Sequence, residues 1–163
     1  MTYPDRMTPE LLREALREVL YGPSVTFGFS AGLFSDPETG LLRTAHAFTF
    51  PQAQQAAGPG RPAAAQVVVH LRQHLEHAAA QLSDPHALRP DEPDAWDAQR
   101  LTEASWRAEL VALARAGQGL YDALFGALDA EALRVAHGAV LHAAYHTGAL
   151  RFHLRNLQAE PAG

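Results

Sequence analysis

Residues 130–157 have the sequence AEALRVAHGAVLHAAYHTGALRFHLRNL, which is the longest uninterrupted helical pattern in the chain. Its main apolar face consists of Leu133, Ala136, Val140, Ala144 and Leu154. These positions fall on one side of a helix that turns by about 100° per residue. Asp129 directly precedes the segment and supplies a side-chain N-cap. We therefore expect a long amphipathic helix over 130–157.

Three further segments show the same periodicity, and they predict helices at 9–21, 62–82 and 103–127. The first begins with Thr8 as N-cap and Pro9 at the first helical position, and the third begins behind Thr102. Four helices of such length predict an all-α fold of the four-helix-bundle class. We expect a single domain over 8–158, with flexible termini at 1–7 and 159–163.

A long irregular insertion separates the first two predicted helices. Alternating apolar residues at 25–29 and again at 44–50 predict a short hairpin between these two stretches, with turn-forming residues at 35–40. The composition of Gln52–Gly60 (QAQQAAGPG) is typical of a linker. A second segment, 84–101, is rich in Pro and Asp and predicts an acidic surface loop.

Composition excludes several classes of chemistry. The chain has 163 residues, no Cys, and 13 basic residues that are all Arg. These absences exclude disulfides, thiolate metal sites, a cysteine nucleophile and a Schiff-base lysine. The formal charge of −5 argues against nucleic acid as a partner. No apolar stretch approaches the roughly 20 residues of a membrane span, and MTYPDRMTPE lacks the apolar core of a signal peptide. We expect a cytoplasmic protein without a membrane partner.

Nine His residues are the most unusual feature of the chain. His70 and His74 are four residues apart in the predicted helix 62–82, and His142 and His146 are four apart in 130–157. This spacing directs two imidazoles from one helix face toward one ion. A single pair is weak evidence, since exposed helical His residues give the same spacing by chance. Periodicity alone favours His74 over His70 as the inward residue.

Two segments carry a resemblance to a known family. The segments QVVVHLRQHLEHA (66–78) and LHAAYHTGALR (141–151) resemble the DinB-like superfamily, the damage-inducible and YfiT-like four-helix bundles described as metal-dependent hydrolases. The resemblance implies that His70, His142 and His146 are metal ligands. Ala149 departs from the pattern, because the family usually has Gln at this position. For the ligand in the predicted helix 62–82, the resemblance implies His70, whereas periodicity favours His74.

The resemblance also implies a cofactor and a reaction. The cofactor is a divalent ion, with zinc or nickel favoured and iron or manganese as alternatives. The reaction is hydrolysis, or transfer of a low-molecular-weight thiol such as bacillithiol, on a small-molecule substrate. An alternative is a non-catalytic, stress-related bundle that binds a partner or dimerises and keeps a vestigial metal site. A homodimer is compatible with both.

Further residues are candidates for contacts with the substrate or for proton transfer. Tyr145, Arg151 and His74 are candidates for substrate binding, although Arg151 also complements the negative end of the helix dipole. Trp96, Trp106 and Tyr121 are candidates for lining a pocket or for the core. The candidate bases are the carboxylates Glu76, Asp91, Glu92, Asp94 and Asp97, for which a solvated surface position is the alternative.

Overall fold

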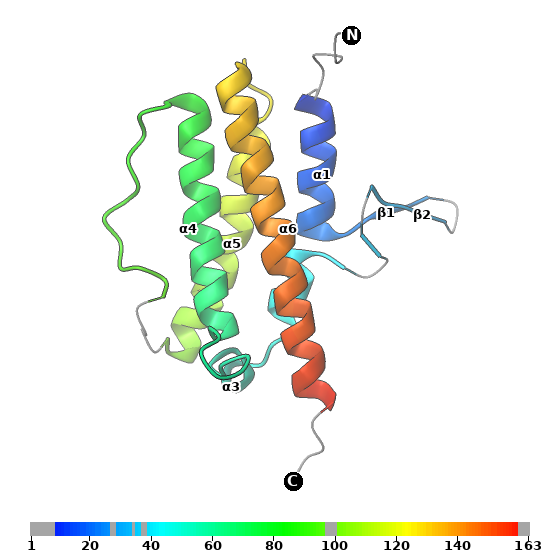
Figure 1. Ribbon diagram of the computed structural model, residues 1–163, viewed down its shortest axis with the longest axis vertical. Coiled ribbons are helices and arrows are strands. Elements are labelled where there is room, and N and C mark those ends of the chain that lie inside the picture. The colour runs from blue at the N-terminus through cyan, green and yellow to red at the C-terminus, as the bar shows by residue number, and fades with distance from the viewer. Residues whose placement is uncertain (1–8, 27–28, 34, 37–38, 97–100, 160–163) are drawn as a thin grey trace.

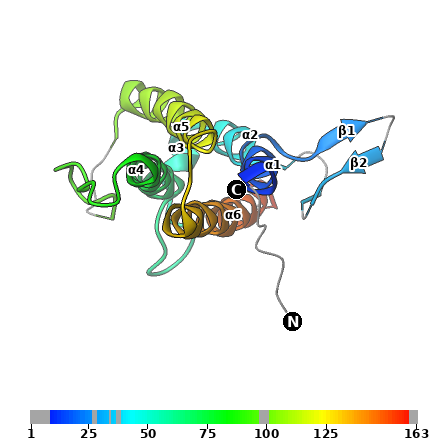
Figure 2. The ribbon, with the colours of Figure 1, turned by 90° about the horizontal axis from the view of Figure 1, so that it is seen from above.

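The computed structural model describes residues 9–26, 29–33, 35–36, 39–96 and 101–159. Its long helices are α1 (Pro9–Tyr21), α4 (Ala64–Ser83), α5 (Glu103–Ala123) and α6 (Ala130–Ala159). They lie side by side along the long axis of the molecule (Figure 1), and seen from above they surround a common interior (Figure 2). The described chain is mostly helical, as the sequence predicts.

Each long helix buries one stripe of apolar side chains. The largest fully buried side chains include Leu12, Leu16 and Leu20 of α1, Leu71 and Leu75 of α4, Leu113 and Leu120 of α5, and Leu150 of α6. Burying one such leucine stabilises the fold by roughly 1.5–3 kcal/mol. The buried stripe of α6 differs because it consists largely of Ala132, Ala136, Ala139 and Ala143. Small side chains at a contact let helices approach closely, which allows α6 to lie against α4.

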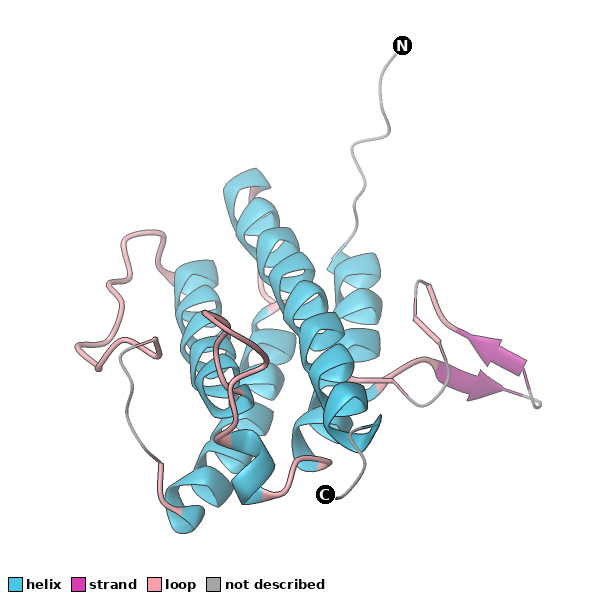
Figure 3. Cartoon of the chain, turned by 60° about the horizontal axis from the view of Figure 1, so that its bottom comes forward, coloured by secondary structure: helices cyan, strands magenta, loops and turns pink. Residues whose placement is uncertain are grey.

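The insertion after α1 contains the part of the prediction that is wrong. Strand β1 (Ser24–Thr26) pairs antiparallel with β2 (Phe29–Ala31), and not with residues 44–50 (Figure 3). Residues 44–50 instead contribute to the short helices α2 (Leu41–His46) and α3 (Phe50–Ala53). The residues buried there are Leu41, Thr44, Ala45 and Phe48. Their spacing of three, one and three is helical, and the apparent alternation concealed it.

The predicted linker also begins inside α3, whose first turn is closed by a capping box. Thr49 Oγ1 accepts from the Gln52 amide, and Gln52 Oε1 accepts from the Thr49 amide. Beyond α3, residues 54–63 form a compact loop closed by a bridge between Ala56 and Ala63. This loop leads into α4 and lies beside α6 (Figure 3).

A buried carboxylate holds the segment after the hairpin against α1. Glu18 is 4% exposed, and it accepts hydrogen bonds from the amides of Leu33 at 2.5 Å and Ser35 at 2.7 Å. The chain then returns past the end of α1 at Gly40, which has φ +127°. A Cβ on Gly40 would lie 2.7 Å from the Gly22 amide nitrogen, so only glycine fits.

Several expectations concern the ends of the chain and the second loop. Residues 84–96 run outside α4 as a loop (Figure 1), while 97–100 lie outside the described residues. The ends expected to be flexible, 1–7 and 159–163, also lie outside them except for Ala159, which is helical as the last residue of α6. Among the described helices, none is both long and apolar enough to cross a membrane.

Candidate metal centre

Histidines of α4 and α6 meet where these two helices face each other. His70 Nε2 lies 2.7 Å from His142 Nε2. Together with His146, they place one ring nitrogen each within 4.8 Å of the other two. The i, i+4 spacing on α6 points His142 and His146 toward the same side, and the close approach of α4 supplies the third imidazole. These three residues form the three-histidine cluster.

The environment of the cluster keeps its imidazoles neutral. Burial, together with the neighbouring His142 and His70, lowers the pKa of His146 to about 4. Burial also lowers the pKa of His70 and of His142, with additional contributions from His142 and Arg89 at His70 and from Arg89 at His142. A half-buried imidazole that is surrounded by other imidazoles gains a positive charge only at a cost. Neutral rings offer lone pairs to a cation at neutral pH.

The donor set of the cluster fits a divalent ion. Zinc takes imidazole nitrogens at about 2.0–2.1 Å, and three of them leave at least one position for water or substrate. In the hydrogen bond between His70 and His142, one of the two Nε2 atoms carries a proton. When an ion binds, this proton must move to the Nδ1 atom of the same ring, because a coordinating nitrogen is unprotonated. The three-histidine cluster could therefore hold one metal ion.

The loop outside α4 covers one side of the cluster with an indole ring. The Trp96 ring centroid lies 4.5 Å from that of His70 and 6.4 Å from that of His146. Its backbone is fixed at both ends, since the Trp96 amide donates to Asp94 Oδ1 at 3.0 Å and Gln66 Nε2 donates to the Trp96 carbonyl at 3.2 Å. Trp96 thus lies at the site, whereas the buried Trp106 belongs to the core.

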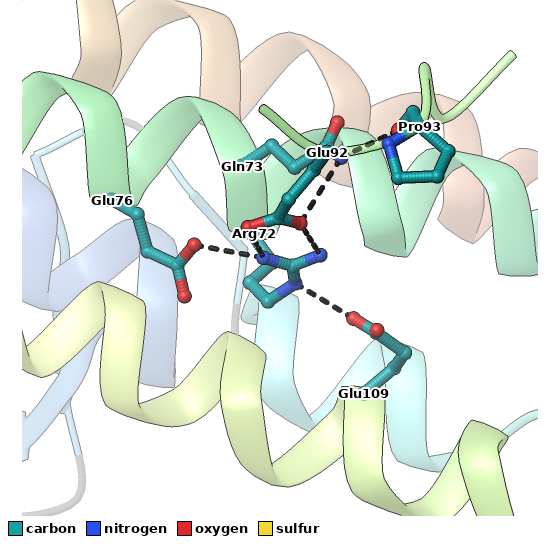
Figure 4. Close-up of polar contacts among 6 residues, drawn as sticks. All are labelled: Arg72, Gln73, Glu76, Glu92, Pro93 and Glu109. Carbon is teal, nitrogen blue, oxygen red and sulfur yellow. Dashed lines mark hydrogen bonds and ion pairs between the residues drawn. The ribbon is translucent and has the colours of Figure 1, made fainter. Parts of the chain in front are cut away.

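The same loop is attached to the bundle through Arg72, which is only 8% exposed (Figure 4). Arg72 Nε donates to Glu109 of α5 at 2.8 Å, and its terminal nitrogens donate to Glu76 at 2.8 Å and to Glu92 of the loop at 2.7 Å. The hydrogen bond from Arg72 lowers the pKa of Glu92. One guanidinium therefore joins α4, α5 and the loop next to the three-histidine cluster.

Arg72 binds two of the carboxylates that the sequence offers as candidate bases. Glu76 and Glu92 are bound to Arg72, and Asp94 accepts the Trp96 amide. Asp91 is exposed, and Asp97 lies outside the described residues. Within the described residues, no carboxylate forms a hydrogen bond with the three-histidine cluster. Sequence reasoning missed Arg72, because the sequence of α4 does not show that α5 and the loop would each bring a carboxylate to this residue.

The candidates for substrate binding lie at different distances from the cluster. The His74 ring packs against that of His142 with centroids 4.2 Å apart, and burial lowers its pKa to about 4. His74 is nevertheless not one of the three residues whose nitrogens converge, although periodicity favoured it. Tyr145 lies edge-on to His146 at 5.1 Å and is 71% exposed. Arg151 lines a separate cavity of about 180 Å³ to which none of these His residues contributes.

Two cavities adjoin the cluster from different sides. A polar one of about 190 Å³ is lined by His70 and His74 of α4 and by charges of both signs from the loop, which contributes Arg89, Glu92, Asp94 and Trp96. A more apolar one of about 420 Å³ lies on the other side of His146, toward the C-terminal part of α6. A ligand entering either cavity would reach an imidazole of the centre.

The fold and the site together define a mostly helical protein whose three-histidine cluster could hold a metal ion. Comparisons of the chain with protein-family models, with curated proteins and with solved structures give no match. The DinB-like assignment therefore rests on the resemblance of the two histidine-bearing segments alone.

Proposed function

We propose that this protein is a divalent-metal-dependent enzyme of the DinB-like type, which transfers a low-molecular-weight thiol to an electrophilic small molecule. Hydrolysis at the same centre is the alternative reaction. The observation that carries the proposal is the convergence of three imidazole nitrogens from α4 and α6 within 4.8 Å. Neutral imidazoles suit zinc or nickel best, with iron and manganese as alternatives.

The chemistry of the bound ion decides between the two reactions. A divalent cation lowers the pKa of a water or a thiol that binds to it. Hydrolysis usually employs a carboxylate base beside the metal-bound water, and the described carboxylates nearby are paired with Arg72 or with a backbone amide. A thiol ionises far more readily than water, so it needs no protein base. Arg72 holds Glu76 and Glu92, which leaves Asp94 as the candidate base that lines the polar cavity beside His70. We favour thiol transfer because it does not depend on this one carboxylate.

Residues around the centre have distinct roles in this reaction. His70, His142 and His146 hold the ion, and Trp96 shields one side of them from water. The thiolate sulfur attacks an electrophilic carbon, a new C–S bond forms, and the leaving group departs with the electron pair of the bond that breaks. The thiol proton passes to solvent. Arg89 lines the polar cavity next to His70 and His74 and provides a positive charge for an anionic thiol.

A transfer assay tests the proposal. Bacillithiol, glutathione, cysteine and coenzyme A are each incubated with 1-chloro-2,4-dinitrobenzene and with zinc- or nickel-loaded protein, and chloride is released as the C–S bond forms. We expect one thiol to react faster than without protein, and the gain to disappear in His146→Ala. The control variant His137→Ala, on the same helix but outside the cluster, should keep the activity. Metal-loaded protein that accelerates none of the four reactions, but hydrolyses ester substrates, would favour hydrolysis.

A non-catalytic bundle is the second candidate. Two observations favour it: Ala149 occupies the position where the family has Gln, and the described carboxylates make no hydrogen bond to the cluster. Positioning partners around metal-bound His residues are a common feature of working centres. Metal binding without turnover of any thiol or ester substrate would support this candidate.

A further inference from the structure

The larger cavity beside His146 lies between α6 and a distant part of the chain, the loop 54–63 with the adjoining start of α4. The loop 54–63 contributes Arg61, α4 contributes Val67, and α6 contributes residues from Tyr145 to His153. Its volume of about 420 Å³ falls within the range of small-molecule sites, which is roughly 300–1,000 Å³. A single water occupies about 30 Å³ of liquid, so the cavity accommodates an organic molecule.

Most of the cavity wall is apolar. Val67 and Leu150 are buried and form its inner part, while Tyr145 and Phe152 are exposed at 71% and 69%. Large exposed aromatic side chains next to a buried apolar wall provide a surface that a hydrocarbon body can cover. The ligand that fits this wall has an apolar body.

A buried histidine adds a polar group that has no partner. His153 is 4% exposed, its ring packs against Phe48 with centroids 5.5 Å apart, and it lines the cavity. Its Nε2 atom is buried and has no hydrogen-bond partner in the described part of the chain. A buried polar atom left without a partner is costly, but Nε2 has almost no accessible surface, so it lies beneath the cavity wall and not at it.

The charges around the cavity have one sign. Arg61 lines it from the loop, and no carboxylate is among the described residues that line it. Arg61 is exposed and forms no ion pair with the described residues around it. A guanidinium recognises carboxylates by paired hydrogen bonds. The ligand that fits this edge carries an anionic group.

We propose that this cavity binds an amphiphilic carboxylate, with its apolar body against Val67 and Leu150 and its carboxylate at Arg61. Its role as the substrate cavity of the centre rests on the proposed function, because His146 belongs to both. Binding itself requires neither a metal ion nor turnover.

Calorimetric titration of metal-free protein with octanoate tests the proposal. We expect saturable binding of one octanoate per chain and at least about tenfold weaker binding of octylammonium, which has the same body and the opposite charge. Arg61→Gln should weaken octanoate binding at least about threefold. Arg155→Gln, which removes an exposed α6 cation outside the cavity lining, should leave it unchanged. Absence of octanoate binding, or equal binding by Arg61→Gln, would overturn the proposal.

Two further variants place the ligand within the cavity. Ala149→Trp, at an exposed position of the lining, should abolish octanoate binding, whereas Gln158→Trp on the same helix outside the lining should not. Binding that survives Ala149→Trp would contradict the location.

The same titrations separate this proposal from the proposed function. Metal-loaded protein that transfers a thiol but never binds octanoate would refute the cavity proposal alone. Protein that binds octanoate normally but holds no metal would refute the metal-dependent function alone.

Discussion

The Nε2 atoms of His70 and His142 lie 2.7 Å apart, although 72 positions separate the two residues in the sequence. The contact depends on the packing of α6 against α4, and the alanine-rich buried face of α6 allows that packing. Burial lowers the pKa of both imidazoles and so favours their neutral forms. The Nε2–H group of one neutral ring donates to the Nε2 atom of the other. The candidate metal centre is thus a product of tertiary structure.

The two histidines of α4 should differ in their importance for metal binding. His70 contributes a nitrogen to the cluster, while the His74 ring only packs against His142. We expect His70→Ala to weaken zinc binding by at least about 100-fold and His74→Ala by less than about tenfold. Competition with a chromophoric chelator measures both affinities. The opposite order would identify His74 as the ligand, in agreement with helical periodicity.

Arg72 should be a major determinant of stability. It is buried, and it binds Glu76, Glu92 and Glu109, which retain partial contact with solvent. We expect Arg72→Met to lower the free energy of unfolding by about 2–3 kcal/mol, because the variant leaves three carboxylates without a cation. Denaturant unfolding measures this change. The exposed Arg107, which pairs with Glu103, supplies the control, and Arg107→Met should change stability by less than about 0.5 kcal/mol.

The ion pair between Arg72 and Glu92 should make stability depend on pH in the acidic range. Arg72 lowers the pKa of Glu92 below its ordinary value of 4.5 in the folded protein. The pair therefore contributes fully above pH 4.5, and its contribution is lost as the pH falls through the depressed folded pKa. We expect the free energy of unfolding of wild type to exceed that of Glu92→Gln by about 0.5–1 kcal/mol near about pH 6, and this margin to shrink as the pH falls below 4.5. A margin that grows on acidification would contradict the assignment.

Trp96 should report metal binding optically. The chain has two Trp residues: the ring of Trp96 lies 4.5 Å from that of His70, while Trp106 is buried in the core. Nickel, which quenches nearby indoles, should lower the emission of wild type and leave that of Trp96→Phe nearly unchanged. Fluorescence titration checks this. Equal quenching in Trp96→Phe would show that the loop does not hold Trp96 against the cluster.

The long helices could be predicted from sequence because helical periodicity is a local feature. The face predicted for α6 is correct only in part, since Ala136 and Val140 are buried whereas Leu133, Ala144 and Leu154 are only partly buried. The segment expected at 9–21 coincides with α1, and the segments expected at 62–82, 103–127 and 130–157 differ from α4, α5 and α6 by a few residues at their ends. Residues 44–50 were predicted wrongly as a strand, since a short apolar segment fits both periods when its burial is unknown. The burial of Leu41, Ala45 and Phe48 decides in favour of helical spacing.

The site was predicted less completely than the helices. The resemblance indicated His70, whereas periodicity favoured His74, because α4 contacts both α5 and α6 and its inward arc is wider than one stripe. The Arg72 contacts could not be predicted, since Glu76, Glu92 and Glu109 come from two helices and a loop. The unpartnered Nε2 of His153 is also evident only from the packing around it.

Metal content of purified, tag-free protein tests the central claim most directly. Elemental analysis is carried out on wild type, on His146→Ala and on the control His137→Ala, each after incubation with zinc or nickel and removal of unbound ion. We predict about one ion per chain in wild type and in His137→Ala, and none in His146→Ala. Wild type without metal, or His146→Ala with full occupancy, would contradict the three-histidine metal centre.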